Sequence, residues 1–316
     1  TDCSPGAFGP VRHSAALGAF CPWFCNSYDS SINASAYHQS TTDRWGSTVG
    51  WVNETAQRLN AWGFNTVGCW SSPLLTQPRG ETSSAPRNGE VVGENLLYAY
   101  PLDMLLTPYE HRFEDAMPVD IWSTDFVDRC NMIAAREVAP RKNDTHLIGY
   151  WTDNEVKWNA QDQPPGYDLF SSTLLRLHKT KSSSLSTVMG WLTERYNHSI
   201  VAFNQACDTS LKAWSELPLR VPLPKTVARD VDNLAFAEYY SATYHRISSA
   251  AIRAHDPNHL VIGSRYNDVN SAVVQAVIKG ARDSTDLLDV HIYSTEPNVE
   301  TLWLLHTLRM ESAADE

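Results

Sequence analysis

The amino-acid sequence predicts an α/β fold, namely a TIM-type (β/α)8 barrel that is incomplete, with about six βα units present. Three observations predict it. Short apolar runs alternate with helical patterns, which is typical of a parallel sheet covered by helices. Polar or aromatic residues follow several of these runs directly, as they do at the carboxyl ends of barrel strands. The length of 316 residues suits one barrel domain.

The predicted strands share a short apolar run with polar or aromatic residues at its end: 14–20, 64–70, 96–106, 145–151, 259–266 and 286–294. A doubly wound open sheet is the alternative. No G-x-G-x-x-G motif follows any of these runs, so a dinucleotide site is not supported.

The predicted helices have apolar residues at helical spacing: 49–63, 123–140, 230–255 and a last one from near Val299. In the first, Val52, Ala56 and Leu59 lie on one face and Gly63 ends the helix. Ser123 or Thr124 is the expected N-cap of the second, and Pro140 its end.

The middle of the chain differs, because residues 156–230 show helical patterns and a Pro-rich stretch but no convincing strand. We interpret this segment as a helical insertion after the fourth strand. The expected organisation is one barrel domain over residues 1–316 that contains this insertion.

Composition indicates the class of partner. The net charge of −11 argues against nucleic acid, whose binding requires clustered Lys and Arg. No apolar run is long enough to span a membrane. Eleven Trp and thirteen Tyr are many for this length, and sugar rings stack on aromatic faces, although most Trp residues pack in cores. We therefore expect one or two of these aromatic residues to stack on a sugar, and we expect no membrane or nucleic-acid partner.

Four N-glycosylation sequons, at Asn33, Asn53, Asn143 and Asn197, favour a secreted or extracellular protein. The six cysteines include no CxxC pair, and the histidines show no HExxH spacing, so we expect neither a metal nor another cofactor. Disulfide pairing and oligomeric state do not follow from the sequence.

The fourth predicted strand ends in Asp153, Asn154 and Glu155, close to Trp151 and Trp158. A carboxyl group among tryptophans is partly desolvated, which raises its pKa towards the range of a general acid. Asn154 could donate a hydrogen bond to a substrate hydroxyl. The alternative is structural: one of these carboxylates caps the next segment or pairs with a basic residue.

Four separated blocks resemble a known family: RLNAWGFNTVGCWSS, HLIGYWTDNEVKW, RYNHSIVAFNQACDTSLKAWSEL and AIRAHDPNHLVIGSRY. They are similar to stretches of the agarase-like enzymes of glycoside hydrolase family 50 and its relatives among the clan A barrels. The resemblance implies retaining hydrolysis of β-linked galactose-containing polysaccharide or oligosaccharide. It also implies that Glu155 is the general acid/base, that Asn154 contacts the hydroxyl beside the scissile bond, and that Trp70 lies at the mouth of the site.

A retaining mechanism also needs a carboxylate nucleophile. The family supplies a Glu at the end of its seventh strand, and the resemblance places Tyr293 near it. Glu296, Glu300 and Glu311 do not end a predicted strand here. We therefore expect that strands seven and eight and the nucleophile lie beyond Glu316, and that this fragment alone is inactive.

Trp158, which follows the fourth predicted strand, is a further candidate substrate-binding residue. The other candidates end predicted strands. Arg265 ends the fifth and could bind a hydroxyl or orient a carboxylate, or form a structural ion pair. His291 and Tyr293 alternate on the sixth and so share one face; His291 is equally a candidate for a barrel-core histidine. The alternative functions are a β-galactosidase-like exo-hydrolase of the same clan and a carbohydrate-binding barrel without a nucleophile.

Overall fold

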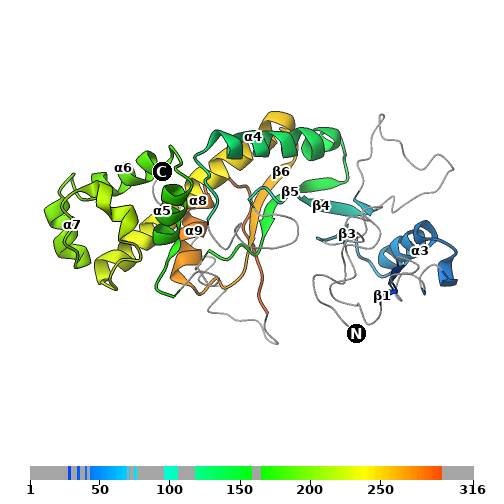
Figure 1. Cartoon of the computed structure of the whole chain (residues 1–316). Coiled ribbons are helices and arrows are strands. Elements are labelled where there is room, and N and C mark those ends of the chain that lie inside the picture. Colours follow the sequence, from blue (N-terminus) through cyan, green and yellow to red (C-terminus); the bar gives the residue numbers. More distant parts are fainter. Residues whose placement is uncertain are drawn as a thin grey trace, which may run out of the picture. The chain divides into compact units, whose positions relative to one another are not determined.

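The computed structural model describes residues 28–29, 34–35, 40, 43–69, 71, 75–76, 96–105, 118–158 and 165–293 (Figure 1). The chain divides into two compact units: Thr1–Tyr100 with Pro140–Gly149, and Pro101–Ala139 with Tyr150–Glu316. The predicted strand at 14–20 and the predicted last helix lie outside the described residues. A single barrel domain over residues 1–316 stays a prediction.

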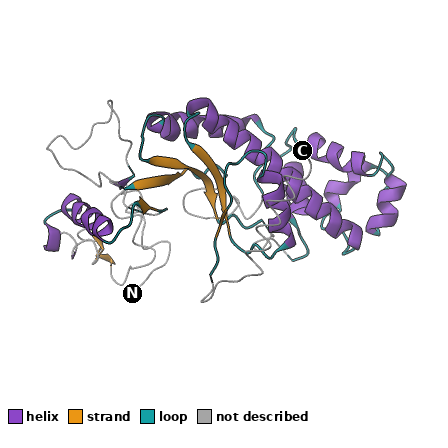
Figure 2. Ribbon diagram, turned by 180° about the vertical axis from the view of Figure 1, so that it is seen from behind, coloured by secondary structure: helices purple, strands orange, loops and turns teal. Residues whose placement is uncertain are grey.

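The main sheet has the strand order β3-β4-β5-β6-β7, which follows the chain without a reversal. Its strands are β3 (Thr66–Val67), β4 (Leu97–Pro101), β5 (Leu147–Asn154), β6 (Leu260–Tyr266) and β7 (Asp289–Val290). Figure 2 draws the strands in orange. β3 pairs in parallel with β4, and β6 with β7. Barrels add strands in chain order, whereas doubly wound sheets reverse at a switch point. The α/β prediction is confirmed, and the number of barrel units stays a prediction.

The first unit also holds a short antiparallel pair, β1 (Tyr28–Asp29) with β2 (Ala34–Ser35). Helix α3 (Thr48–Ala61) confirms the helix predicted at 49–63. Ser47 caps it by accepting a hydrogen bond from the Gly50 backbone N–H at 3.0 Å. The strand that follows, β3, is shorter than the predicted run of 64–70.

The helix predicted at 123–140 begins as α4 (Thr124–Ile133), with Ser123 as its N-cap. The Ser123 hydroxyl accepts a hydrogen bond from the Phe126 N–H at 3.2 Å. The helix then widens into the π-helix η5 (Ala134–Val138) and tightens into the 3₁₀ helix η6 (Ala139–Arg141). The expectation that the helix closes at Pro140 is wrong by one residue, because a 3₁₀ turn accepts proline near its start.

Helices occupy the described part of the segment between β5 and β6, where the sequence predicts a helical insertion. They are α5 (Leu169–Lys179), α6 (Leu185–Arg195), α7 (Ile200–Cys207), the 3₁₀ helix η7 (Trp214–Leu219) and α8 (Val227–His255). Aromatic rings join them: Phe236 of α8 lies 5.1 Å from Phe170 of α5 and 5.2 Å from Trp191 of α6, between ring centroids.

The long helix α8 forms the centre of the second unit. Its predicted apolar face is largely confirmed, because Phe236, Tyr240 and Tyr244 are fully buried. Helix α9 (Ala272–Ala281) packs closely against it. A Cβ atom at Gly280 of α9 would lie 2.3 Å from the carbonyl oxygen of Glu238, so this approach requires glycine.

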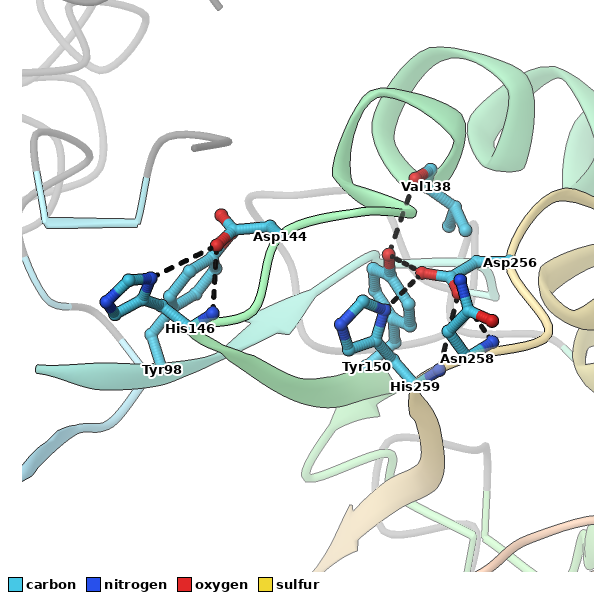
Figure 3. A network of polar contacts seen from close by, with 8 residues as sticks. All are labelled: Tyr98, Val138, Asp144, His146, Tyr150, Asp256, Asn258 and His259. Atoms are coloured by element: carbon cyan, nitrogen blue, oxygen red, sulfur yellow. Dashed lines mark hydrogen bonds and ion pairs between the residues drawn. The ribbon is translucent and has the colours of Figure 1, made fainter. Parts of the chain in front are cut away.

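Buried carboxylates fix the segments that lead into β5 and β6 (Figure 3). In the second unit, Asp256 accepts a hydrogen bond from the Tyr150 hydroxyl at 2.7 Å and lies 2.7 Å from His259 Nδ1. In the first unit, Asp144 accepts a hydrogen bond from the Tyr98 hydroxyl at 2.8 Å. These contacts tie the chain just before each strand to a tyrosine of the neighbouring strand, β5 or β4.

Candidate active site

The candidate site begins where β5 ends. The strand runs to Asn154, three residues beyond the predicted run, so Asp153 and Asn154 belong to it and are buried. Glu155 follows with φ 50, and its N–H donates to the carbonyl of Arg265 at 2.9 Å. A left-handed backbone is uncommon for residues other than glycine, and such strain concentrates at functional sites.

The carboxylate of Glu155 meets two residues that follow β7. Glu155 Oε1 accepts a hydrogen bond from the Tyr293 hydroxyl at 2.8 Å and contacts His291 Nδ1. The predicted strand of 286–294 is shorter in the structure and ends at Val290, so His291 and Tyr293 do not alternate on a strand; both side chains nevertheless contact the same carboxylate oxygen. The Glu155 side chain is 28% exposed and that of His291 12%, so both side chains are only partly accessible to solvent.

Tyr293 is suited to donate a hydrogen bond to Glu155, because its phenol carries a proton. Its hydrogen bond to Glu155 raises the pKa of the phenol above its ordinary value, and the negative charge of Glu155 acts in the same direction. The phenol therefore stays protonated at neutral pH. His291 Nδ1 faces the same carboxylate oxygen, which favours the tautomer that carries its proton on Nδ1.

Asn154 is held by Arg265 of the neighbouring strand. Arg265 Nη1 donates to Asn154 Oδ1 at 3.0 Å. On its other side, Arg265 Nε lies 3.7 Å from Asp289 Oδ2, and the same oxygen accepts a hydrogen bond from Trp151 Nε1 at 2.7 Å. No local pattern marks Asp289 as a site residue, because its contacts depend on how β6 and β7 align.

Asp153 lies two residues before Glu155 but contacts a different set of residues. Its carboxyl group accepts from the Leu105 N–H at 3.0 and 3.1 Å and from the Tyr244 hydroxyl of α8. Burial, followed by the charge and hydrogen bond of Asp153, raises the pKa of Tyr244 well above its ordinary value. Asp153 is therefore a structural anchor beneath the site.

Two tryptophans, Trp158 and Trp70, are predicted to contact the substrate. Trp158 is 1% exposed and packs against Tyr240 and Tyr244, with ring centroids 6.2 and 6.1 Å away. Its predicted contact with substrate is therefore not supported, because the chain after Glu155 turns inward and neither ring face is open to a sugar. Trp70 lies outside the described residues, as do Glu296, Glu300 and Glu311.

The residues that the structure describes include no group of three or more His, Cys, Asp or Glu side chains that could hold a metal ion. Within the same residues, no helix is long and apolar enough to cross a membrane.

No protein-family model matches the chain. Among curated proteins, it is 25% identical over 266 residues to beta-agarase A of Vibrio sp. (strain JT0107), covering 82% of this chain and 26% of that protein. It is 26% identical over 259 residues to beta-agarase B of the same strain, covering 80% and 25%. The chain thus spans about a quarter of the length of these relatives.

Solved structures show the same fold at lower identity. The agarase AgWH50C aligns with a TM-score of 0.67 and 18% identity over 87% of this chain and 38% of that chain. PfGH50B aligns with a TM-score of 0.68 and 17% identity over 87% and 39%. An exo-beta-agarase gives 0.65 and 19% over 87% and 36%. In sequence and in fold, the chain is therefore similar to agarase-like glycoside hydrolases over most of its length.

Proposed function

We propose that this protein is a retaining glycoside hydrolase of β-linked, galactose-containing polysaccharide or oligosaccharide, with Glu155 as its general acid/base. The observation that carries the proposal is the setting of Glu155. It directly follows β5, has a left-handed backbone, and shares one carboxylate oxygen with Tyr293 and His291. The similarity to beta-agarases supports the substrate class.

Each residue has a chemical part in this proposal. Glu155 protonates the oxygen of the leaving sugar and later removes a proton from the attacking water. Tyr293 and His291 hold its carboxyl group in one orientation, with the phenol as a steady donor. Asn154 donates its amide to the hydroxyl beside the scissile bond. Retention further requires a nucleophile about 5 to 5.5 Å from Glu155, which we place after the described residues.

The proposal also includes a (β/α)8 barrel fold and secretion from the cell. A (β/α)8 barrel is supported by strands that lie side by side in chain order. Secretion is supported by the four sequons, of which Asn53, Asn143 and Asn197 lie in described segments. Both features suit an enzyme that meets a polymer outside the cell.

The test compares Glu155→Gln with the wild type in the whole protein, using agarose oligosaccharides and an aryl β-galactoside with a good leaving group. We expect kcat/KM on oligosaccharides to fall by about 10² to 10⁴-fold, because the leaving sugar needs a proton. The loss on the aryl substrate should be smaller, and azide should restore turnover by replacing the water that needs a base.

Glu194→Gln is the matched control, because Glu194 lies on α6 with a side chain that is 75% exposed. It should behave as wild type. Full activity of Glu155→Gln on oligosaccharides would contradict the proposal. Tight binding of galactose-containing oligosaccharides without hydrolysis by the wild type would instead favour the carbohydrate-binding alternative.

A further inference from the structure

Arg265 links three strands at the edge of the candidate site. It lies on β6 between Asn154 of β5 and Asp289 of β7, with Nη1 3.0 Å from Asn154 Oδ1 and Nε 3.7 Å from Asp289 Oδ2. Its guanidinium carbon lies 5.1 Å from the ring centroid of Trp151. A cation over an indole face and beside a carboxylate has two attractive contacts that restrict its position.

The contact with Arg265 determines how the Asn154 amide is presented. Because a guanidinium can only donate, the amide oxygen must face Arg265. The amide nitrogen then lies on the opposite side of the planar group. Asn154 is 7% exposed, so its side chain has little freedom to turn over unless Arg265 moves.

Asp289 in turn determines where Arg265 lies. One carboxylate oxygen of Asp289 accepts from Trp151 Nε1 at 2.7 Å and faces Arg265 Nε. Within the described residues, Arg265 Nε is buried without a hydrogen-bond acceptor, so the charge of Asp289 is what balances it there. Removing that charge leaves Arg265 with its hydrogen bond to Asn154 and its stacking on Trp151.

We propose that Asp289 is a positioning residue, which acts through Arg265 to aim the Asn154 amide N–H at a substrate hydroxyl next to the scissile bond. This inference rests on the proposed function of the site. Asp289 itself does not touch the reacting atoms. Its effect on hydrolysis should therefore depend on Asn154 and on the presence of that hydroxyl in the substrate.

The experiment measures kcat/KM of the whole protein for an aryl β-galactoside and for its 2-deoxy analogue. We expect Asp289→Asn to lose about tenfold on the galactoside and less than about twofold on the deoxy compound. In the Asn154→Ala variant, the further change Asp289→Asn should cause no additional loss of kcat/KM, because the amide that Asp289 orients is absent. Equal losses on both substrates, or additive losses in the double variant, would overturn the proposal.

The matched control is Asp283→Asn, an exposed aspartate beside Arg282, which should leave both substrates unaffected. Asp289→Glu keeps the charge and should recover most of the loss, so a folding defect in Asp289→Asn does not end the test. If Asp289→Glu is as defective as Asp289→Asn on both substrates, Asp289 has only a structural role.

A second readout does not depend on catalysis. In ¹⁵N-labelled protein, the side-chain NH₂ signals of Asn154 are assigned from their loss in Asn154→Ala. They should shift and exchange faster with solvent in Asp289→Asn and not in Asp283→Asn. Unchanged signals would overturn the positioning role. Changed signals in a protein that hydrolyses no galactoside would uphold the network and count against the proposed function.

Discussion

Replacing Tyr244 by Phe removes one hydroxyl from the buried centre of the second unit. We expect the free energy of unfolding to fall by about 1.5 to 3 kcal/mol, the usual worth of a hydrogen bond to a charged group. The hydroxyl donates to Asp153, the anchor beneath the site, and both side chains are at most 1% exposed. Water therefore cannot replace the lost donor in the folded protein.

The size of the effect follows from what the substitution leaves in place. The Phe ring keeps the packing of Tyr244, whose centroid lies 6.1 Å from Phe126, 6.1 Å from Trp158 and 4.5 Å from His245. No large cavity forms, so the cost is that of the hydrogen bond. Asp153 retains the Leu105 N–H, which keeps the cost below that of an isolated buried carboxylate.

Urea unfolding, followed by far-UV circular dichroism, measures the difference in the free energy of unfolding between the two proteins. The comparison requires that both have the same m-value, the slope of that free energy against urea concentration. Tyr239→Phe is the matched control, because Tyr239 lies on the same helix and stacks on Trp191 at 5.7 Å between centroids. Its cost should stay within about 0.5 kcal/mol. If Tyr244→Phe unfolds at the same urea concentration as Tyr239→Phe, the Tyr244 hydroxyl does not anchor Asp153 and this reasoning is refuted.

The remaining predictions concern alkaline pH and the α8 to α9 contact. Burial raises the pKa of Tyr240, Tyr244 and Tyr266, so their contribution is complete below the unfolded pKa of about 10 and is lost above it, by up to about 1.36 kcal/mol per pH unit each. Urea midpoints at about pH 8, 10 and 11 measure this loss, which should be less steep in Tyr244→Phe. Gly280→Ala should cost at least about 1 to 3 kcal/mol by the same urea assay, because the added Cβ meets Glu238.

The alkaline-pH prediction and the Gly280→Ala prediction have separate controls. A urea midpoint that does not change between about pH 8 and 11 would contradict the assignment of raised tyrosine pKa values. Gly190→Ala is the matched change for Gly280, because an added Cβ there meets nothing within 4 Å, so it should be neutral or stabilising. Equal stability of the two alanine variants would contradict the close helix approach.

The sequence predicts the regular elements well, because their patterns are local. The face of α8 repeats at helical spacing, and Phe236, Tyr240 and Tyr244 are buried as that repeat requires. Glu155 could also be selected, since it follows an apolar run and lies within one of the family-like blocks. In both cases, the pattern within one continuous segment of the chain was enough.

Other features depend on contacts between strands that no local pattern encodes. Asp289 looks like an ordinary strand residue until β7 is aligned with β6, which brings it to Arg265 and Trp151. Trp158 shows the opposite error. An aromatic residue soon after a strand suggests a sugar platform, yet the chain turns inward at Val156, so Trp158 enters the core instead.

The backbone conformation of Glu155 depends both on its place after β5 and on contacts with other elements. A left-handed conformation costs about 1 to 3 kcal/mol for such a residue, and it persists only where the neighbours hold it. Asp153 is fixed on one side by Leu105 and Tyr244, and Val156 is buried on the other. The hydrogen bond from the Glu155 N–H to Arg265 holds the residue between them. Core residues of α8 therefore help to support the geometry of the proposed acid/base, although they lie outside the site itself.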